Sequence, residues 1–402
     1  MFIALAGKPS VGKSSFFKAA TLAEVEIANY PFTTLKSSEG VAFVKVDCVD
    51  KEFNTQCNPR EGYCINHKRF IPVKIVDIPG LIEGSHQGLG KGNQFLADIA
   101  QCDVLIHIID ISGSTNEKGE AVPPLTHDPI KDVHFLEKEI DLWFLSLVKK
   151  GFEKFLKTLK TLKTQDNQNI KVPLAKQLSG LNIKEEDIQE AIKKLNLIHH
   201  PKDWSGEDLL SLSSELRKRA KPMIIAANKI DVEGSEFNLH KLQKEFPHLT
   251  VIPCSAESEL ALKEAAKHKL IEYIPGESSF KIINKEKLTQ QQEKALIFIK
   301  EKILDKYKST GVQDVLDKTV FEFLKYIAIF PGGVSKLEDS EGRRLPDCFL
   351  MPQNSTALDF AFKIHSDLGN NFIKAIDVRK KVAVGRDHVL KHRDVIEIKT
   401  SK

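Results

Sequence analysis

Eight residues near the start of the chain restrict its fold more than any other segment. The sequence Gly7-Lys-Pro-Ser-Val-Gly-Lys-Ser14 follows a short apolar run, residues 2–6, and precedes a helical pattern that begins at Lys13. It fits G-x-x-x-x-G-K-[ST], a loop whose backbone N–H groups surround phosphates together with the N-terminus of the next helix. A turn rich in small residues is the alternative, and the position between a strand and a helix favours the phosphate-binding loop.

This loop predicts a nucleotide site with Mg²⁺ as cofactor. The expected binding residues of the loop are Gly7, Lys8, Pro9, Ser10, Val11, Gly12, Lys13, Ser14 and Ser15. Lys13 can reach the β- and γ-phosphates, and the Ser14 hydroxyl can ligate Mg²⁺. Asp77 ends an apolar run, where a carboxylate can hold the same ion, and the Gly80 N–H can sense a γ-phosphate. Thr34 can add a third metal ligand and order a switch segment.

Two further motifs predict which base is bound. Asn228-Lys-Ile-Asp231 follows one apolar run, and Ser255-Ala256 follows the next. Asp231 can accept from the N1–H and the exocyclic amine of guanine, which adenine does not offer, and Asn228 can meet N7. The stem of Lys229 can lie along the base, and a backbone N–H at Ser255 or Ala256 can donate to the guanine oxygen. Their order, each at a strand end, predicts a guanine nucleotide, with GTP as substrate and GDP as product.

The composition limits the class of protein. The chain has 402 residues, 41% hydrophobic and 28% charged, which excludes a disordered or fibrous chain and predicts two or three domains. The 59 Lys and Arg against 55 Asp and Glu leave a net charge of +4, which does not indicate binding by bulk charge, so no DNA specificity is expected. No long apolar stretch or signal peptide is recognisable, so we expect a cytoplasmic monomer without membrane contact.

The pattern of apolar runs predicts an α/β fold. Near-continuous apolar runs alternate with helical stretches, which is typical of a mostly parallel sheet covered on both faces. The expected domains are a P-loop domain at 1–129 and 221–275, a helical insertion at 130–220, a helical connector at 276–327 and a small α+β domain at 328–402. Single helices are expected over 312–326 and over 357–368.

The motifs resemble those of the Obg superfamily of P-loop GTPases, in the archaeal-looking form of its YchF branch. The resemblance rests on Asn29-Tyr-Pro-Phe-Thr-Thr34, Asp77-Ile-Pro-Gly-Leu-Ile-Glu-Gly84 and Gly92-Asn-Gln-Phe-Leu96, and on a tail similar to a TGS module, a β-grasp fold. It covers nearly the whole chain and implies a cytoplasmic nucleotide hydrolase that associates with the ribosome or ribosomal RNA. Bacterial and eukaryotic relatives in this branch typically alter the base-reading motif and favour ATP. This chain keeps Asn228-Lys-Ile-Asp231, so we expect GTP, with ATP preference as the alternative.

Catalysis is the least determined part of the prediction. The expected catalytic groups are Lys13, Thr34, Gly80 and His107. The resemblance implies His107 as a helper, although its apolar surroundings are more typical of a buried structural histidine. His86, in a glycine-rich segment, is another candidate. The position after Gly80, which often carries a water-orienting Gln in Ras-like enzymes, is Leu81, so we expect slow intrinsic hydrolysis. A nucleotide-gated RNA- or ribosome-binding module with incidental hydrolysis is therefore the alternative function.

Three cysteines cluster in the sequence outside these motifs. Cys48, Cys57 and Cys64 are followed by His67. Their spacing is compatible with a small zinc site without matching a standard knuckle. A disulfide, or small half-buried residues in a β excursion, are the alternatives, and the sequence alone leaves the choice open.

Two basic segments are candidates for contact with ribosomal RNA. One is a helical stretch with the lysines Lys149, Lys150, Lys154, Lys157, Lys160 and Lys163. The same pattern is typical of the solvated face of a packed helix. The other lies in the tail and comprises Arg379, Lys380, Lys381, Arg386, Lys391 and Arg393. Contact of either segment with RNA predicts binding that weakens steeply with salt.

Overall fold

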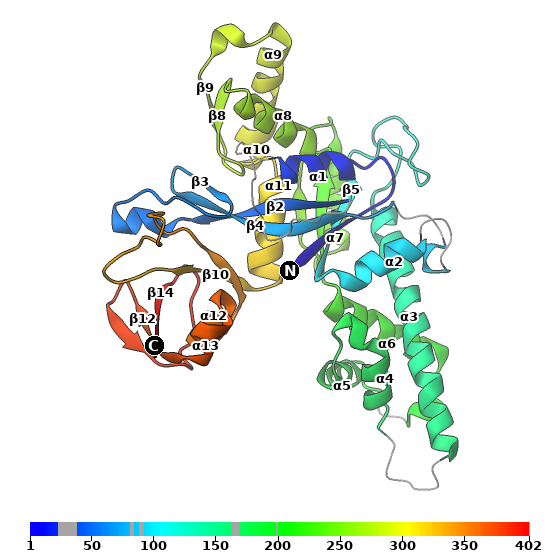
Figure 1. Cartoon of the computed structure of the whole chain (residues 1–402). Helices are drawn as coiled ribbons and strands as arrows, with labels where there is room; N and C mark the ends of the chain where they lie inside the picture. The colour runs from blue at the N-terminus through cyan, green and yellow to red at the C-terminus, as the bar shows by residue number, and fades with distance from the viewer. Residues whose placement is uncertain (23–37, 81–83, 88–91, 162–168, 198–199, 402) are drawn as a thin grey trace. The chain divides into compact units, whose positions relative to one another are not determined.

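The computed structural model describes residues 1–22, 38–80, 84–87, 92–161, 169–197 and 200–401. The chain forms two compact units, one of Met1–Phe17 with Ile75–Glu257 and the other of Lys18–Lys74 with Ser258–Lys402. Both units therefore combine segments that are distant in the sequence, which the colours of Figure 1 make visible. No helix in these described ranges has the length and hydropathy needed to cross a membrane.

A parallel sheet forms the centre of the first unit. Its strands β1 (Phe2–Ala6), β5 (Val104–Asp110), β6 (Met223–Asn228) and β7 (Val251–Pro253) pair in this order, all in parallel. β5 and β6 are buried along their whole length, which explains their unbroken apolar sequences. The expected mostly parallel α/β sheet is confirmed. Because parallel strands end at one edge, the segments that follow them meet there.

The sheet continues beyond β1 through β4 (Lys68–Asp77) to β2 (Glu39–Asp47). The strand connections carry α1 (Lys13–Thr21), η2 (Ser85–Gln87), α2 (Gly92–Gln101), α7 (Ser235–Glu245) and α8 (Ala256–Lys267).

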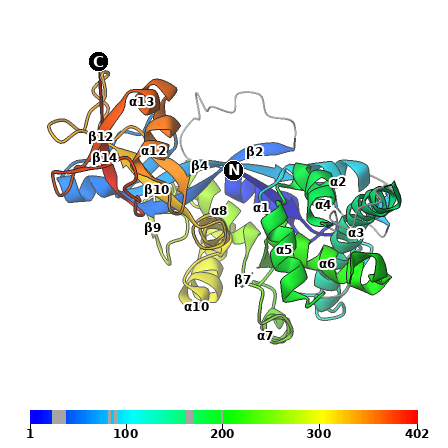
Figure 2. The same cartoon turned by 90° about the horizontal axis from the view of Figure 1, so that it is seen from below.

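A lobe of helices is inserted between β5 and β6. It consists of α3 (Ile130–Thr161), α4 (Lys171–Leu178), η3 (Ser179–Leu181), α5 (Glu185–Lys194), η4 (Pro201–Asp203) and α6 (Gly206–Ala220). Figures 1 and 2 show α4 and α6 lying along the long helix α3. The helix α6 begins at Gly206, because Ser205 and Asp208 form a reciprocal capping box.

Short elements adjoining β2 and β4 belong to the second unit. β3 (Tyr63–Ile65) forms an antiparallel hairpin with β4, and η1 (Val49–Phe53) follows β2. The hairpin is held by aromatic packing, with the rings of Tyr63 and Phe70 stacked 4.5 Å apart.

The segment after α8 contains short strands as well as helices. Its elements are β8 (Ile271–Tyr273), β9 (Phe280–Ile282), η5 (Lys285–Lys287), α9 (Gln290–Phe298), η6 (Ile299–Leu304), α10 (Asp305–Tyr307), α11 (Val312–Lys318) and η7 (Thr319–Phe323). The single helix expected over 312–326 is wrong at its end. Lys325 adopts a left-handed backbone (φ 52°), which terminates the helix, and the next residue starts a strand.

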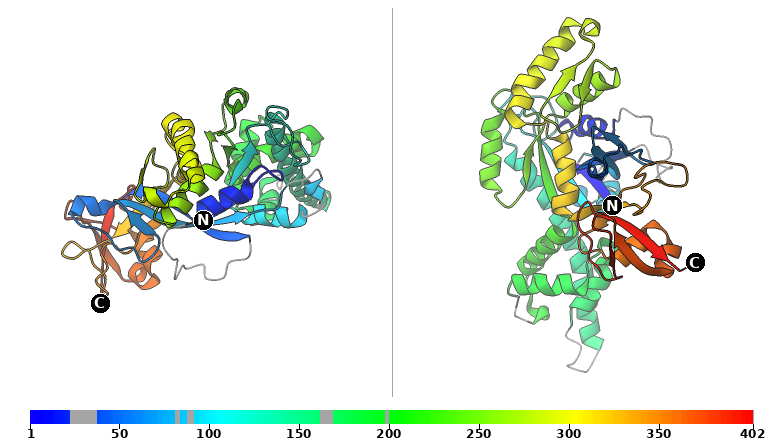
Figure 3. Two further views of the ribbon diagram at one scale, coloured as in Figure 1. Left: turned by 90° about the horizontal axis from the view of Figure 1, so that it is seen from above. Right: turned by 90° about the vertical axis from the view of Figure 1, so that its left-hand side faces the viewer.

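The C-terminal module is a five-stranded sheet against which α12 and α13 pack, and it is the orange-to-red part of Figure 3. Its strand order is β11-β10-β14-β12-β13. The elements are β10 (Tyr326–Pro331), β11 (Phe349–Pro352), α12 (Ala357–Ile364), α13 (Ser366–Asn370), β12 (Phe372–Asp377), β13 (Val382–Val384) and β14 (Val395–Thr400). The expected α+β domain is confirmed. The helix expected over 357–368 is broken, because His365 is extended and caps α13.

Candidate nucleotide-binding site

The loop between β1 and α1 has the backbone that its glycines predict. Gly7 and Gly12 both have positive φ angles. A Cβ atom on Gly7 would collide with the carbonyl oxygen of Ile108, and one on Gly12 would collide with the side chain of Asn228. The loop therefore needs glycine at both positions, and α1 begins directly afterwards at Lys13, so its first N–H groups face the loop.

Lys13, Ser14 and Asp77 gather at the mouth of this loop. The Lys13 ammonium donates to the carbonyl oxygen of Lys8 (2.9 Å), and the Ser14 hydroxyl lies 3.3 Å from Oδ2 of Asp77. Burial raises the pKa of Asp77, and the Lys13 charge partly opposes this. Burial also lowers the pKa of Lys13, against the attraction of Asp77. The two charges are thus held in a poorly solvated place.

These residues fit a Mg²⁺ ion. Oδ1 of Asp77 is buried and has no hydrogen-bond partner among the described residues. A carboxylate and a hydroxyl are the oxygen donors that Mg²⁺ prefers. Gly80 lies against the ring of Pro9, where an added Cβ would be 3.2 Å away, so its backbone approaches the loop closely. The expected ligand Thr34 and the neighbouring Leu81 lie outside the described residues.

Asn228 joins three of the predicted motifs. Its side-chain amide donates to the carbonyl oxygen of Val11 (2.9 Å), and its side-chain oxygen accepts from the N–H of Ala256 (3.0 Å). Asn228 is buried, so both bonds form away from water. The phosphate loop, the end of β6 and the Ser255-Ala256 segment are therefore brought together, as the sequence predicts. Contact of Asn228 with N7 of a base remains a prediction.

Lys229 and Asp231 have different roles within the base-reading motif. Lys229 has a left-handed backbone (φ 64°), and its ammonium binds Oδ2 of Asp110 (2.9 Å) and the hydroxyl of Thr115 (3.1 Å). The Asp231 carboxylate is half-buried and forms no hydrogen bond or ion pair within the described part of the chain. Lys229 thus fixes the motif to the end of β5, while Asp231 keeps its acceptor oxygens available.

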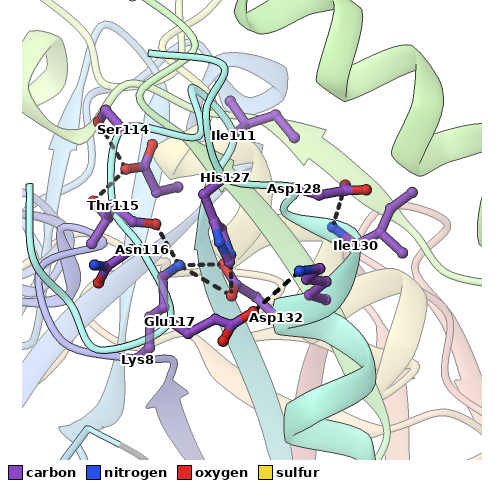
Figure 4. Close-up of polar contacts among 12 residues, drawn as sticks. Lys8, Ile111, Ser114, Thr115, Asn116, Glu117, His127, Asp128, Ile130 and Asp132 are labelled. Carbon is purple, nitrogen blue, oxygen red and sulfur yellow. Dashed lines mark hydrogen bonds and ion pairs between the residues drawn. The ribbon is translucent and has the colours of Figure 1, made fainter. Parts of the chain in front are cut away.

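A buried ion pair behind the phosphate loop was not predicted from the sequence. Figure 4 shows the Lys8 ammonium between the carbonyl oxygen of Thr115 (2.7 Å) and the carboxylate of Asp132 (2.9 Å). His127 contacts the same carboxylate through Nε2 (2.8 Å). Lys8 is 5% exposed, so its side chain points into the protein and only its backbone faces the loop. The sequence gives no local sign of this pair, because Asp132 is 124 residues away.

Asp110 anchors the segment that connects β5 to α3. Although burial alone would raise the pKa of Asp110, hydrogen bonds from Ser112, Thr115 and Lys229 lower it below its usual value. Thr115 links two charged clusters, because its hydroxyl donates to the carboxylate of Asp110 and its carbonyl oxygen accepts from the ammonium of Lys8. Lys8 also pairs with Asp132 in the first turn of α3, so this helix is connected to the phosphate loop.

The two candidate histidines differ in their surroundings. His107 is 1% exposed on β5, and burial, with Lys13 and Lys8 nearby, lowers its pKa to about 3. It is therefore neutral at physiological pH and packed in the sheet, which favours the structural interpretation. Nδ1 of the His86 ring lies 2.8 Å from a carboxylate oxygen of Glu139 on α3, and the backbone N–H groups of His86 and Gly84 also donate to this carboxylate. Glu139 thus fixes the backbone at Gly84 and His86.

Fold and site together define a P-loop nucleotide-binding protein. Comparison with known proteins agrees: residues 2–141 match the family model for "50S ribosome-binding GTPase", residues 226–333 the model for "Obg-like GTPase YGR210-like, G4 motif-containing domain", and residues 339–400 the "TGS domain". The chain is 45% identical to a GTP-binding protein of Methanocaldococcus jannaschii over 397 residues, 98% of each chain. It is 28% identical to the ribosome-binding ATPase YchF of Mycoplasma pneumoniae over 270 residues, 65% of this chain and 68% of the other.

A solved structure supports the same assignment. The crystal structure of a GTP-binding protein from Pyrococcus horikoshii covers 100% of both chains, with 38% sequence identity and a TM-score of 0.75. The chain belongs to the Obg-like GTPases, in their YchF-type branch, and it carries a C-terminal TGS domain.

Proposed function

We propose that this chain binds GTP with Mg²⁺, hydrolyses it slowly to GDP and acts as a ribosome- or translation-associated switch. The observation that carries the proposal is the double hydrogen bond of Asn228 to Val11 and Ala256, which joins the phosphate loop to the base-reading segments. The Asp231 carboxylate, which belongs to the same motif as Asn228, is half-buried and has no partner in the described ranges. It is therefore available as an acceptor for guanine.

The residues have separate tasks in this mechanism. Bound Mg²⁺ would neutralise charge on the transferring phosphoryl group, and Ser14, Thr34 and Asp77 would hold it. Lys13 would leave the Lys8 carbonyl and bind the β- and γ-phosphates, and the Gly80 N–H would contact the γ-phosphate. No glutamine follows Gly80 to orient the attacking water, so we expect slow turnover without a partner.

Nucleotide affinity and hydrolysis test the proposal. Calorimetry with Mg²⁺ should give tighter binding of GDP than of ADP, and Lys13→Ala should weaken GDP binding by about 100-fold through loss of a charged phosphate contact. Lys18→Ala, on the same helix, is the matched control and should bind normally. Equal affinity for ADP would contradict the guanine assignment. ATP preference has support in the name of the Mycoplasma relative, so ATP and GTP hydrolysis should be compared directly.

Ribosome association is supported by the family model for "50S ribosome-binding GTPase" and by the name of the Mycoplasma relative. The structure narrows the candidate contacts in the TGS domain. Arg379 and Arg393 form ion pairs with Glu52, and Lys380 with Asp377. The exposed cations of that set without side-chain partners in the described ranges are Lys381, Arg386 and Lys391.

Fewer lysines of the long helix α3 are available for contact with RNA in the structure than its sequence indicates. Phe152 and Phe155 are buried in the helical lobe, so its lysines lie opposite a packed stripe. Lys149 and Lys150 are exposed. Lys154 instead donates to Gln177 (2.6 Å). The side chain of Lys160 and the whole of Lys163 lie outside the described residues.

Co-sedimentation with ribosomes tests this part. We expect the full chain to pellet with ribosomes more in the presence of a GTP analogue than of GDP, and binding to fall steeply with added salt. Replacing Lys381, Arg386 and Lys391 together by Ala should weaken binding, whereas the exposed lysines Lys285, Lys287 and Lys294 of the connector provide a control of equal charge. Binding that is insensitive to nucleotide and salt would contradict the switch.

A further inference from the structure

Three of the six cysteines, none of them part of the nucleotide site, lie close together in the second unit. The sulfur atoms of Cys48, Cys57 and Cys64 and a carboxylate oxygen of Asp50 all lie within 4.8 Å of one another. Cys48 and Cys57 are the nearest pair, with their Sγ atoms 3.5 Å apart. Cys48, Asp50 and Cys57 are buried and Cys64 is half-buried, so the cluster is closed to solvent on most sides.

Local backbone structure brings these groups together. Cys48 follows β2 and is the N-cap of η1, which contains Asp50 and ends at the left-handed Asn54 (φ 49°), so that the chain returns to Cys57. The Cys57 N–H donates to Oδ2 of Asp50 (2.9 Å). Cys64 comes from β3, in the hairpin with β4.

The distances agree with a tetrahedral metal site. Zinc–sulfur bonds of about 2.3 Å in a tetrahedron separate the sulfurs by about 3.8 Å. The 3.5 Å between Cys48 and Cys57 is close to this value, and it is far from the length of about 2.05 Å of a disulfide bond. Three sulfurs and one carboxylate supply four donors, with no position left for a substrate.

We propose that Cys48, Cys57 and Cys64, as thiolates, and the carboxylate of Asp50 bind one structural Zn²⁺ ion. His67 acts as a positioning residue, because its Nδ1 lies 2.9 Å from the other carboxylate oxygen of Asp50. A histidine paired with a ligating carboxylate fixes the orientation of that ligand.

A buried arginine supports the proposal independently. Arg69 is 1% exposed, and it forms no ion pair with a carboxylate within the ranges that the structure describes. Its guanidinium instead lies 3.7 Å from the sulfur of Cys57. A buried cation needs a counter-charge. Three thiolates and a carboxylate around Zn²⁺ carry a net charge of −2, which supplies it.

The site has a structural task within its unit. Arg69 also donates to the carbonyl oxygens of Leu345 (3.1 Å) and Pro346 (2.7 Å), which precede the strand β11 of the TGS domain. The backbone N–H of Asn58 donates to Arg344, and that of Arg60 to Pro346 (both 2.9 Å). The loop between Cys57 and Cys64 therefore holds the entry to the TGS sheet, and Zn²⁺ would fix this loop.

Metal analysis of the full chain, purified without chelators, tests the proposal. We expect about one zinc per chain, as the closed donor set requires. Cys57→Ser should lose most of the zinc, while Cys102→Ser, a buried cysteine of the first unit, should keep it. His67→Ala should weaken zinc affinity by about 10- to 100-fold, as loss of a positioning partner does. Absence of zinc from the wild-type chain, or equal zinc in Cys57→Ser, would overturn the proposal.

Three measurements on the unaltered chain test the proposal even if a variant does not fold. Cobalt exchanged for zinc should give the visible absorption of tetrahedral Co²⁺ with thiolate charge transfer, whereas octahedral Co²⁺ spectra would overturn the proposal. Intact mass and thiol titration should find all six cysteines reduced. A mass two hydrogens too low without bound metal would instead show a disulfide. Removal of zinc by a chelator should speed proteolysis within 332–344 without changing GDP affinity, which separates this site from the nucleotide site.

Discussion

The phosphate end and the base end of the nucleotide site are held in place by different forces. Behind the phosphate loop, Lys8 and Asp132 form a buried ion pair, and His107 is buried and neutral. At the base end, the neutral amide of Asn228 connects the loops, the side chain of Lys229 is 28% exposed where its ammonium pairs with Asp110, and Asp231 stays half-exposed. Buried charges make the phosphate end sensitive to charge removal and pH, whereas the base end should determine only which purine binds.

The largest effect is expected from Lys8→Met. The substitution removes the ammonium from the buried Asp132 carboxylate and leaves it the His127 ring as its remaining contact, which should lower the free energy of unfolding by about 3–5 kcal/mol. Urea denaturation checks this. The double variant Lys8→Met with Asp132→Leu removes both charges and should recover most of the loss. Equal stability of Lys8→Met and the wild type would show that the ion pair does not support the phosphate end.

A smaller effect is expected on acidification. The unfolded chain binds a proton at His107 near pH 6.5, whereas the folded chain does so only near pH 3. Protonation therefore favours the unfolded state, and stability should fall by about 2 kcal/mol between pH 7 and pH 5 from this residue alone. His107→Gln should remove that part of the pH dependence and leave GTP hydrolysis at neutral pH nearly unchanged. If hydrolysis is abolished while the fold persists, His107 is a catalytic helper after all.

The smallest effect is expected from Glu139→Gln. This carboxylate accepts from the N–H groups of Gly84 and His86 and contacts the His86 ring. Replacing it by an amide should cost about 1 kcal/mol locally, because charge-assisted hydrogen bonds become neutral ones. Amide hydrogen exchange should accelerate over Ser85–Gln87. Glu137→Gln, whose residue pairs with Arg217 of α6, is a matched control in the same helix and should leave this segment unchanged.

The sequence predicted the parts of the molecule that depend on local patterns. The strands Phe2–Ala6 and Val104–Asp110 are uninterrupted apolar runs, and the Ser205 cap is a four-residue signal, so both are recognisable without tertiary information. The TGS strand β10 was missed because its apolar residues continue a helical period, and only the left-handed Lys325 separates the two.

The same limit applies to the site residues: local motifs predict which loops meet, but not which distant side chains pair with them. The loops after β1, β6 and β7 converge because parallel strands end at one edge, so the grouping of Gly12, Asn228 and Ala256 could be predicted. The partners of Lys8 and of His86 could not. Asp132 and Glu139 lie on a helix of the insertion, and their positions depend on how that helix packs rather than on any motif.

The most direct test of the account exchanges the carboxylate of Asp231 for an amide. In Asp231→Asn, the carboxamide can donate to the C2 carbonyl of xanthine but no longer accepts both guanine N–H bonds. Calorimetry should show GDP binding weakened by about 100-fold and xanthosine diphosphate binding strengthened to a similar extent, with the fold unchanged. Unaltered GDP affinity in this variant would contradict the assignment of Asp231 as the residue that reads the base.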